Sequence, residues 1–197
     1  MRGNAAQLDW QTICPNKPHA LNTNERLQMA LDIDDQEPSE QQETLTLYIY
    51  DEIYLVGNPP YKGADKQTPE QKADFKAYFG NEEYSGNSDY ISIWFIKGAR
   101  YIGSTKAQLA FVSVNSVCQG EHVSIMFPKI FAEDIEIGFA HTSFKWQNSA
   151  RDQAGVTVIV LSLRNPSKSQ KYLFVDGVQK SVDHINAYLL PSEADIV

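Results

Sequence analysis

The sequence has few positive charges for its length. Its 197 residues include 17 Lys and Arg against 25 Asp and Glu, which gives a formal net charge of −8. A self-sufficient DNA-binding domain needs Lys and Arg to contact phosphates, so this balance argues against one. The acidity is concentrated at one end, because residues 1–57 hold 10 acids and 3 bases whereas residues 58–197 hold 15 and 14. If DNA is the substrate, much of the basic surface must lie on polypeptide outside this sequence.

Cysteines and long apolar runs are also scarce. Cys14 and Cys118 are isolated, with no Cys-x-x-Cys pair and no His at ligand spacing, so we expect reduced thiols and no metal site. No apolar run approaches the length of a membrane span, and the N-terminus lacks a signal-peptide pattern. We therefore expect a cytoplasmic protein with no membrane partner. With 42% hydrophobic residues, the chain can bury one good core.

The most informative stretch is Ile53–Tyr61, which reads Ile-Tyr-Leu-Val-Gly-Asn-Pro-Pro-Tyr. Its four apolar residues predict the end of a strand that is buried on both faces. Gly57 then ends the strand, and the two prolines exclude a helix in the turn. The result is a rigid loop at the carboxyl end of a central strand, which is where open α/β sheets bind their ligands.

This loop combines groups that suit a planar amine. Pro59 and Pro60 have no backbone N–H, so carbonyl acceptors face outward beside the Asn58 amide. Tyr61 adds a flat aromatic face next to them. The pattern indicates a site for a planar group that carries an NH₂, and the alternative is a structural Gly-x-Pro-Pro turn.

Helical and strand patterns alternate through the rest of the chain. A helix begins after Thr68, which is followed by Pro at the first helical position and Gln three residues later. The further predicted elements are a helix over 90–102, a strand over 109–114, a helix over 120–130, and strands over 135–140 and 156–163. This order predicts an α/β fold with a partly parallel sheet, helices on both faces and the last two strands paired as an antiparallel hairpin at the sheet edge.

The domain organisation is less regular near the N-terminus. Residues 1–180 are expected to form one domain, interrupted by a polar, acidic insertion at about 15–44. Residues 45–50 and 53–56 form either one strand or a hairpin. The tail over 181–197 is expected to begin a connection to another domain.

The segment Asn58–Tyr61 resembles the Asn-Pro-Pro-Tyr signature of amino-methyltransferases, which use S-adenosylmethionine as methyl donor. The resemblance implies that Asn58, Pro59, Pro60 and Tyr61 are catalytic. The Asn58 side-chain oxygen and the Pro59 carbonyl would accept both hydrogens of the target amine, while Tyr61 stacks on the base. Asn58 would also contact the cofactor. Two acceptors and correct alignment then carry most of the barrier reduction.

Three ordered segments are together similar to the MmeI-like (type IIL) restriction–modification enzymes: residues 57–61, 113–121 and 139–148. This resemblance implies a partial Rossmann-like class I methyltransferase sheet of the adenine-N6 γ arrangement, acting on double-stranded DNA with a flipped adenine. Phe144, in the loop between the last two strands, would stack on the base opposite Tyr61, and Trp146 is the competing candidate. Near the N-terminus, Asn4 and Ala5 would contact the adenine of the cofactor.

Family members also have a Gly-rich loop that holds the methionine part of the cofactor, and this sequence lacks it. We therefore expect a fragment, whose parent polypeptide supplies the cofactor loop, a target-recognition domain and nuclease domains. The isolated fragment is expected to be inactive and to bind S-adenosylmethionine weakly or not at all. Two alternatives stay open: a non-catalytic binding or assembly module with the same fold, or a methyltransferase that acts on protein glutamine or RNA.

Overall fold

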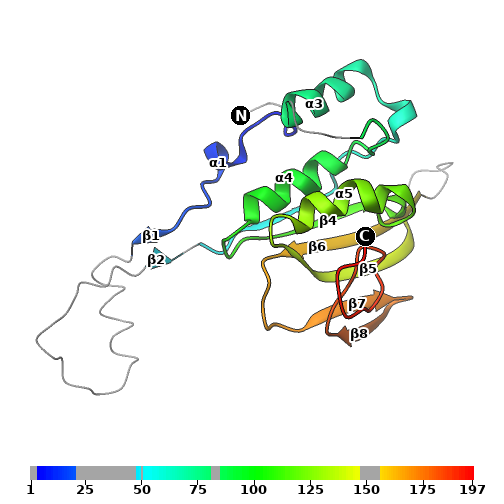
Figure 1. Ribbon diagram of the computed structural model, residues 1–197. Coiled ribbons are helices and arrows are strands. Elements are labelled where there is room, and N and C mark those ends of the chain that lie inside the picture. The colour runs from blue at the N-terminus through cyan, green and yellow to red at the C-terminus, as the bar shows by residue number, and fades with distance from the viewer. Residues whose placement is uncertain (1–3, 21–47, 50, 81–84, 147–155) are drawn as a thin grey trace, which may run out of the picture.

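A six-stranded mixed sheet with the strand order β3-β4-β6-β5-β7-β8 forms the body of the protein (Figure 1). The computed structural model describes residues 4–20, 48–49, 51–80, 85–146 and 156–197. The strands of this sheet are β3 (Tyr54–Gly57), β4 (Gln108–Val114), β5 (Glu136–Trp146), β6 (Val156–Arg164), β7 (Lys171–Val175) and β8 (Val178–Val182). The α/β fold class expected from the sequence is confirmed.

The strands of this sheet pair in both parallel and antiparallel directions. β3 and β4 are parallel, and β6 lies antiparallel between β4 and β5. The predicted antiparallel pairing of β5 with β6 is therefore confirmed. Its predicted place at the sheet edge is wrong, because β7 pairs parallel with β5 and forms a further antiparallel hairpin with β8.

Three longer helices accompany the sheet. They are α3 (Pro69–Phe79), α4 (Ser92–Ile102) and α5 (Glu121–Phe131), and short 3₁₀ turns occur at Ala64–Lys66 (η1) and Asn115–Cys118 (η2). The predicted capping box at the start of α3 is confirmed: the Thr68 hydroxyl accepts from Gln71 N, and the Gln71 side chain accepts from Thr68 N. Glycine lets α4 lie close to β4, because a Cβ on Gly98 would come within 2.4 Å of Leu109 Cδ2.

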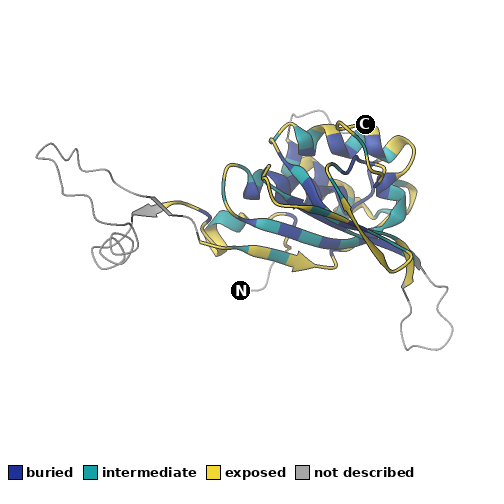
Figure 2. Cartoon of the chain, turned by 90° about the horizontal axis from the view of Figure 1, so that it is seen from below, coloured by how far each residue is buried: buried dark blue, intermediate teal, exposed yellow. Residues whose placement is uncertain are grey.

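The described helices leave one face of the sheet uncovered. α4 and α5 lie on the same face, and Figure 2 shows the strands forming the opposite surface. Along β4 the residues that face the helices, such as Leu109 and Phe111, are buried, while Ala110 and Val112 on the other face are half-buried. Within the described residues, the expectation of helices on both faces is therefore wrong.

Within the described residues, the strand before the Asn-Pro-Pro-Tyr turn is neither central nor buried on both faces. β3 is the first strand in the sheet order and pairs with β4 alone among the described residues. The side chains of Tyr54 and Val56 are 62% and 77% exposed. The prediction failed because a short apolar run indicates a strand without showing which neighbours will cover it.

The segments before β3 form a separate arm. β1 (His19–Ala20) and β2 (Tyr48–Ile49) pair antiparallel in their own two-stranded sheet, so residues 48–49 neither continue into β3 nor pair with it. Most of the predicted acidic insertion at 15–44 lies outside the described residues. Before this arm, residues 4–13, with α1 (Trp10–Ile13), run beside α3 and α4 (Figure 1).

The C-terminal tail packs onto the body of the protein. Ile185, Ala187 and Leu189 are buried, and an isolated antiparallel bridge joins Ile185 to Pro191. That this tail begins a connection to a target-recognition domain remains a prediction.

Candidate active site

The Asn-Pro-Pro-Tyr turn leaves the carboxyl end of β3, as the sequence predicted. Pro59 is buried, Asn58 and Pro60 are exposed, and Tyr61 is half-buried against the core. No hydrogen bond from another described residue engages the Asn58 side chain, so its amide oxygen is available to a ligand. The turn therefore combines a fixed proline with a free amide.

The exit of the turn is tied to the start of α4 by a buried carboxylate. Asp89 Oδ1 accepts hydrogen bonds from the backbone N–H of Lys62 (3.0 Å) and of Ile91 (3.1 Å). The Lys62 carbonyl in turn accepts from Tyr90 N at 2.9 Å. Because both the entry strand and the exit are held, the positions of Asn58 and Pro59 are set by the body of the protein.

A groove of about 480 Å³ runs beside the turn. It is lined by Ala5 and Trp10 from the N-terminal segment, by Trp94 and Phe111 from the core, and by residues 54–59. The structure thus brings Ala5 and Asn58, two residues predicted to contact a cofactor, to the same cavity. Its aromatic lining suits a flat ring system.

Asn4 does not line this groove. Its Nδ2 donates to Asp74 Oδ2 at 2.9 Å, and its Oδ1 accepts from the backbone N–H of Ala6 at 3.0 Å. Both ends of the Asn4 amide are therefore engaged within the protein.

The sequence predicted a loop position for Phe144, and this prediction is wrong. Phe144 and Trp146 both lie on β5, because β5 remains paired with β6 up to Trp146. Phe144 lines a second cavity of about 580 Å³ with His141, Phe174 and neighbouring residues. β5 runs parallel to β3, so this cavity and the Asn58 groove both lie toward the carboxyl ends of these strands. β4 and β6 separate them, and the structure does not bring Phe144 into the groove. The Trp146 side chain lies outside what the structure describes.

Sequence reasoning missed two buried ionic residues behind the groove. Asp74 on α3 accepts hydrogen bonds from Asn4, Gln7 and Tyr90. Burial alone would raise the pKa of Asp74, but these three hydrogen bonds lower it below its ordinary value. The same environment, through burial and the Asp74 carboxylate, raises the pKa of Tyr90.

The second missed residue is Lys97, whose ammonium donates to backbone carbonyls of residues 5, 6 and 8. Burial lowers the pKa of Lys97, and the nearby charge of Asp9 opposes that shift. A sequence signal existed, since Lys97 is a single charge inside the apolar run Ile93–Ala99, and a buried charge requires partners.

Two features are absent from the described residues. Among these residues, no three His, Cys, Asp or Glu side chains are grouped to hold a metal ion. None of their helices is long and apolar enough to cross a membrane.

A mixed sheet with an antiparallel strand inserted beside parallel ones, and an Asn-Pro-Pro-Tyr turn at the carboxyl end of β3, defines the class as a methyltransferase fold. Comparison with known proteins identifies the family, because residues 1–175 match the DNA-methyltransferase domain of MmeI. The chain belongs to this family.

Two relatives illustrate the similarity. DNA methyltransferase A of Bacillus subtilis (strain 168) is 45% identical over 148 residues, which are 75% of this chain and 17% of that protein. The solved structure of the type IIL restriction-modification enzyme MmeI in complex with DNA has a TM-score of 0.68 and 34% identity, and the match covers 74% of this chain and 20% of that one. This chain thus spans about a fifth of the length of these relatives or less.

Proposed function

We propose that this chain is the substrate-side part of an S-adenosylmethionine-dependent DNA adenine-N6 methyltransferase of a restriction–modification system. The observation that carries the proposal is the Asn58 amide, which no described side chain or backbone group engages, held at the carboxyl end of β3 beside an aromatic groove. Membership of the MmeI DNA-methyltransferase family supports it, as do relatives described as a DNA methyltransferase and as a restriction-modification enzyme in complex with DNA.

In this proposal the turn aligns the target amine. The Asn58 side-chain oxygen and the Pro59 carbonyl each accept one hydrogen of the adenine NH₂, so that the nitrogen lone pair leaves conjugation with the ring. Tyr61 stacks on the base, which must leave the duplex to reach the turn. No strong base is needed, because the two acceptors stabilise the positive charge that develops on the nitrogen, and the methylated nitrogen then loses one proton to solvent. When bound, S-adenosylmethionine supplies the electrophilic methyl group.

The groove fits the adenosine part of such a cofactor. Its volume of about 480 Å³ and its lining by Trp10, Trp94 and Phe111 suit a purine ring, and Ala5 and Asn58 border it. The assignment of Asn4 to the cofactor's adenine requires it to exchange a present partner, Asp74 or Ala6, for the ligand.

We further propose that the rest of the active enzyme lies on a longer parent polypeptide. The outer edge of β3 and one face of the sheet are uncovered in the described residues, and the relatives extend far beyond the matched region. The parent would supply the Gly-rich cofactor loop, a target-recognition domain and a nuclease, and would act in the cytoplasm.

Methylation by the parent polypeptide tests the role of the turn. Asn58→Ala is expected to lower methyl transfer to duplex DNA by about a hundredfold or more, because a charge-stabilising acceptor is lost. DNA affinity should stay within about twofold, because Asn58 takes no part in reading the sequence. Asn87→Ala removes an exposed amide that bonds Glu121, away from the groove, and is the matched control.

Analysis of the product distinguishes the alternatives. N6-methyladenine in the DNA supports the proposal. Methylated glutamine in protein, or methylated RNA, would show that the turn acts on that other substrate. If the parent binds DNA but neither it nor Asn58→Ala transfers methyl groups, the chain is a binding module.

A further inference from the structure

Lys97 is a buried lysine in the middle of α4, and its partners are backbone carbonyls. Only 9% of the residue is exposed. Its Nζ donates to the carbonyl oxygens of Ala5 (3.2 Å), Ala6 (3.0 Å) and Leu8. An ammonium group has three N–H donors, so all of them are used on one short stretch of chain.

Aromatic rings complete the environment of this cation. The Nζ atom lies 5.2 Å from the centre of the Trp10 ring and 5.5 Å from that of Tyr78. Trp10 Nε1 also donates to the Ala5 carbonyl at 3.0 Å. The Ala5 carbonyl therefore receives two donors, which fix the orientation of its peptide unit.

A second anchor holds the same stretch from α3. The Asp74 side chain is buried, and its two oxygens accept from Asn4 Nδ2 at 2.9 Å and from Gln7 Nε2 at 2.6 Å. Residues 4–8 are therefore held by a cation on one helix and an anion on another, with no regular secondary structure of their own.

One of the residues that these anchors hold, Ala5, is also a wall of the groove. Ala5 and Trp10 face residues 54–59 across it. The position of Ala5 relative to Asn58 thus depends on Lys97, although Lys97 is not among the residues that line the groove.

We propose that Lys97 is a positioning residue of the methyltransferase site: it sets the wall formed by Ala5 and Trp10 and thereby the binding of the methyl donor in the groove beside Asn58. This inference rests on the proposed function. At this buried position on α4, an apolar side chain would have a smaller desolvation cost than an ammonium group. The charged group is therefore explained better by the chain path it imposes than by helix packing.

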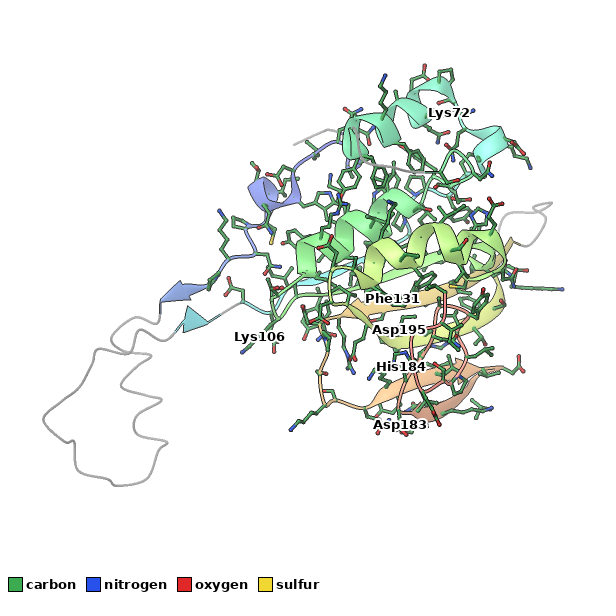
Figure 3. All side chains as sticks on the ribbon, viewed as in Figure 1. Lys72, Lys106, Phe131, Asp183, His184 and Asp195 are labelled. Carbon is green, nitrogen blue, oxygen red and sulfur yellow. The ribbon has the colours of Figure 1, made fainter. Side chains whose placement is uncertain are left out.

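Steady-state methylation by the parent polypeptide tests this inference. Lys97→Met keeps most of the side-chain volume and removes the three hydrogen bonds. We expect the calorimetric Kd and the KM for S-adenosylmethionine both to rise at least tenfold, with kcat changed less than threefold and DNA affinity unchanged. Lys97→Arg should recover part of the loss, because it keeps the charge and several donors. Lys72→Met, an exposed lysine on α3 (Figure 3), is the matched control and should behave as wild type.

Trp10→Phe keeps the test decisive if Lys97→Met fails to fold. It keeps an aromatic ring beside Lys97 and Tyr101 but removes the bond to the Ala5 carbonyl and part of the groove lining, so KM should rise by about threefold. If Lys97→Met or Trp10→Phe is folded and active with an unchanged KM, the inference is overturned while the proposed function stands. The proposed function fails separately, if Asn58→Ala retains full methyl transfer.

Discussion

Phe144 and Trp146 are two residues apart on β5, and one of them is needed as the second aromatic face for an extruded base. Phe144 is 37% exposed, and its ring lies 6.4 Å from that of His141 in an edge-on arrangement. Three strand spacings separate β5 from β3, which corresponds to about 14 Å. Phe144 has the exposure that stacking requires, but base binding must bring the two parts of the site together.

We therefore predict that Phe144→Ala weakens capture of the adenine by about 1–3 kcal/mol, the usual contribution of one stacking face. A mismatch at the target base should restore part of the activity, because the base is then cheaper to extrude. The measurement is methylation of matched and mismatched duplexes by the parent polypeptide. If Trp146→Ala shows this rescue and Phe144→Ala does not, the stacking role belongs to Trp146.

Asp74 gives a pH-dependent prediction at the same scale. Hydrogen bonds lower its pKa in the folded protein, so the stabilisation is fully present above about pH 4 and is lost as the pH falls through the lowered value. Asp74→Asn should reduce the free energy of unfolding by about 2 kcal/mol or more at pH 7, because an amide cannot accept from all three donors.

Urea unfolding of Asp74→Asn and of the wild-type protein, at pH 7 and near pH 3, measures this contribution to the free energy of unfolding. Asp65→Asn is the control, because Asp65 is an exposed residue of η1. The difference between the two proteins should shrink at the lower pH. An equal difference at both values would show that the Asp74 charge contributes nothing.

At the scale of elements, local patterns predicted what forms but not where it lies. α4, β4, α5 and β6 appear within a few residues of the predicted bounds, because each has a strong apolar periodicity. β3 was misplaced, since its position in the sheet depends on partners far away in the sequence. β7 and β8 were missed although Asp176-Gly177 is a hairpin signal, with both residues at positive φ (50° and 77°).

The residues of the candidate site also differ in whether the sequence alone could predict them. The Asn58–Tyr61 turn could be predicted because its residues carry their chemistry within a continuous motif. The anchors could not, because Lys97 and Asp74 act on residues 4–8, about 70 to 90 positions earlier in the chain, and only the tertiary fold brings them together.

A half-buried ionic cluster joins the missed strands to the predicted ones. Glu136 at the start of β5 pairs with Arg164 at the end of β6 (2.8 Å) and with Lys171 at the start of β7 (3.0 Å). All three side chains are only 11–13% exposed. Glu136→Gln leaves two cations facing an uncharged amide, so it should reduce the free energy of unfolding by about 2 kcal/mol.

The matched control is Glu133→Gln, whose pair with Arg100 is about one-third exposed and should matter by less than about 1 kcal/mol. Chemical denaturation of both variants makes the comparison. Equal effects would mean that the cluster does not tie β7 to the sheet.

At the scale of the whole molecule, the outer edge of β3 decides whether the sheet is complete. Its backbone has no further strand partner among the described residues, and an exposed apolar edge invites pairing with another chain segment. The other edge of the sheet ends differently, in the hairpin of β7 and β8, where β8 has mostly exposed residues and three polar side chains, Gln179, Lys180 and Ser181. The apolar edge at β3 is thus the side on which the parent polypeptide is expected to continue the sheet.

The variant Val56→Lys tests whether the parent polypeptide continues the sheet beyond β3 or leaves this edge open. In the isolated chain Val56 is 77% exposed, so the substitution should change the free energy of unfolding by no more than about 0.5 kcal/mol. In the parent polypeptide the same side chain should be covered, and burying an unpaired ammonium group there should cost about 2 kcal/mol or more and lower methyl transfer with it. Thermal and urea unfolding of the variant in both contexts supplies the comparison, with each wild-type protein as its own reference. A small effect in both contexts would show that β3 remains an open edge in the parent, and the cofactor-binding part would then have to dock elsewhere on this chain.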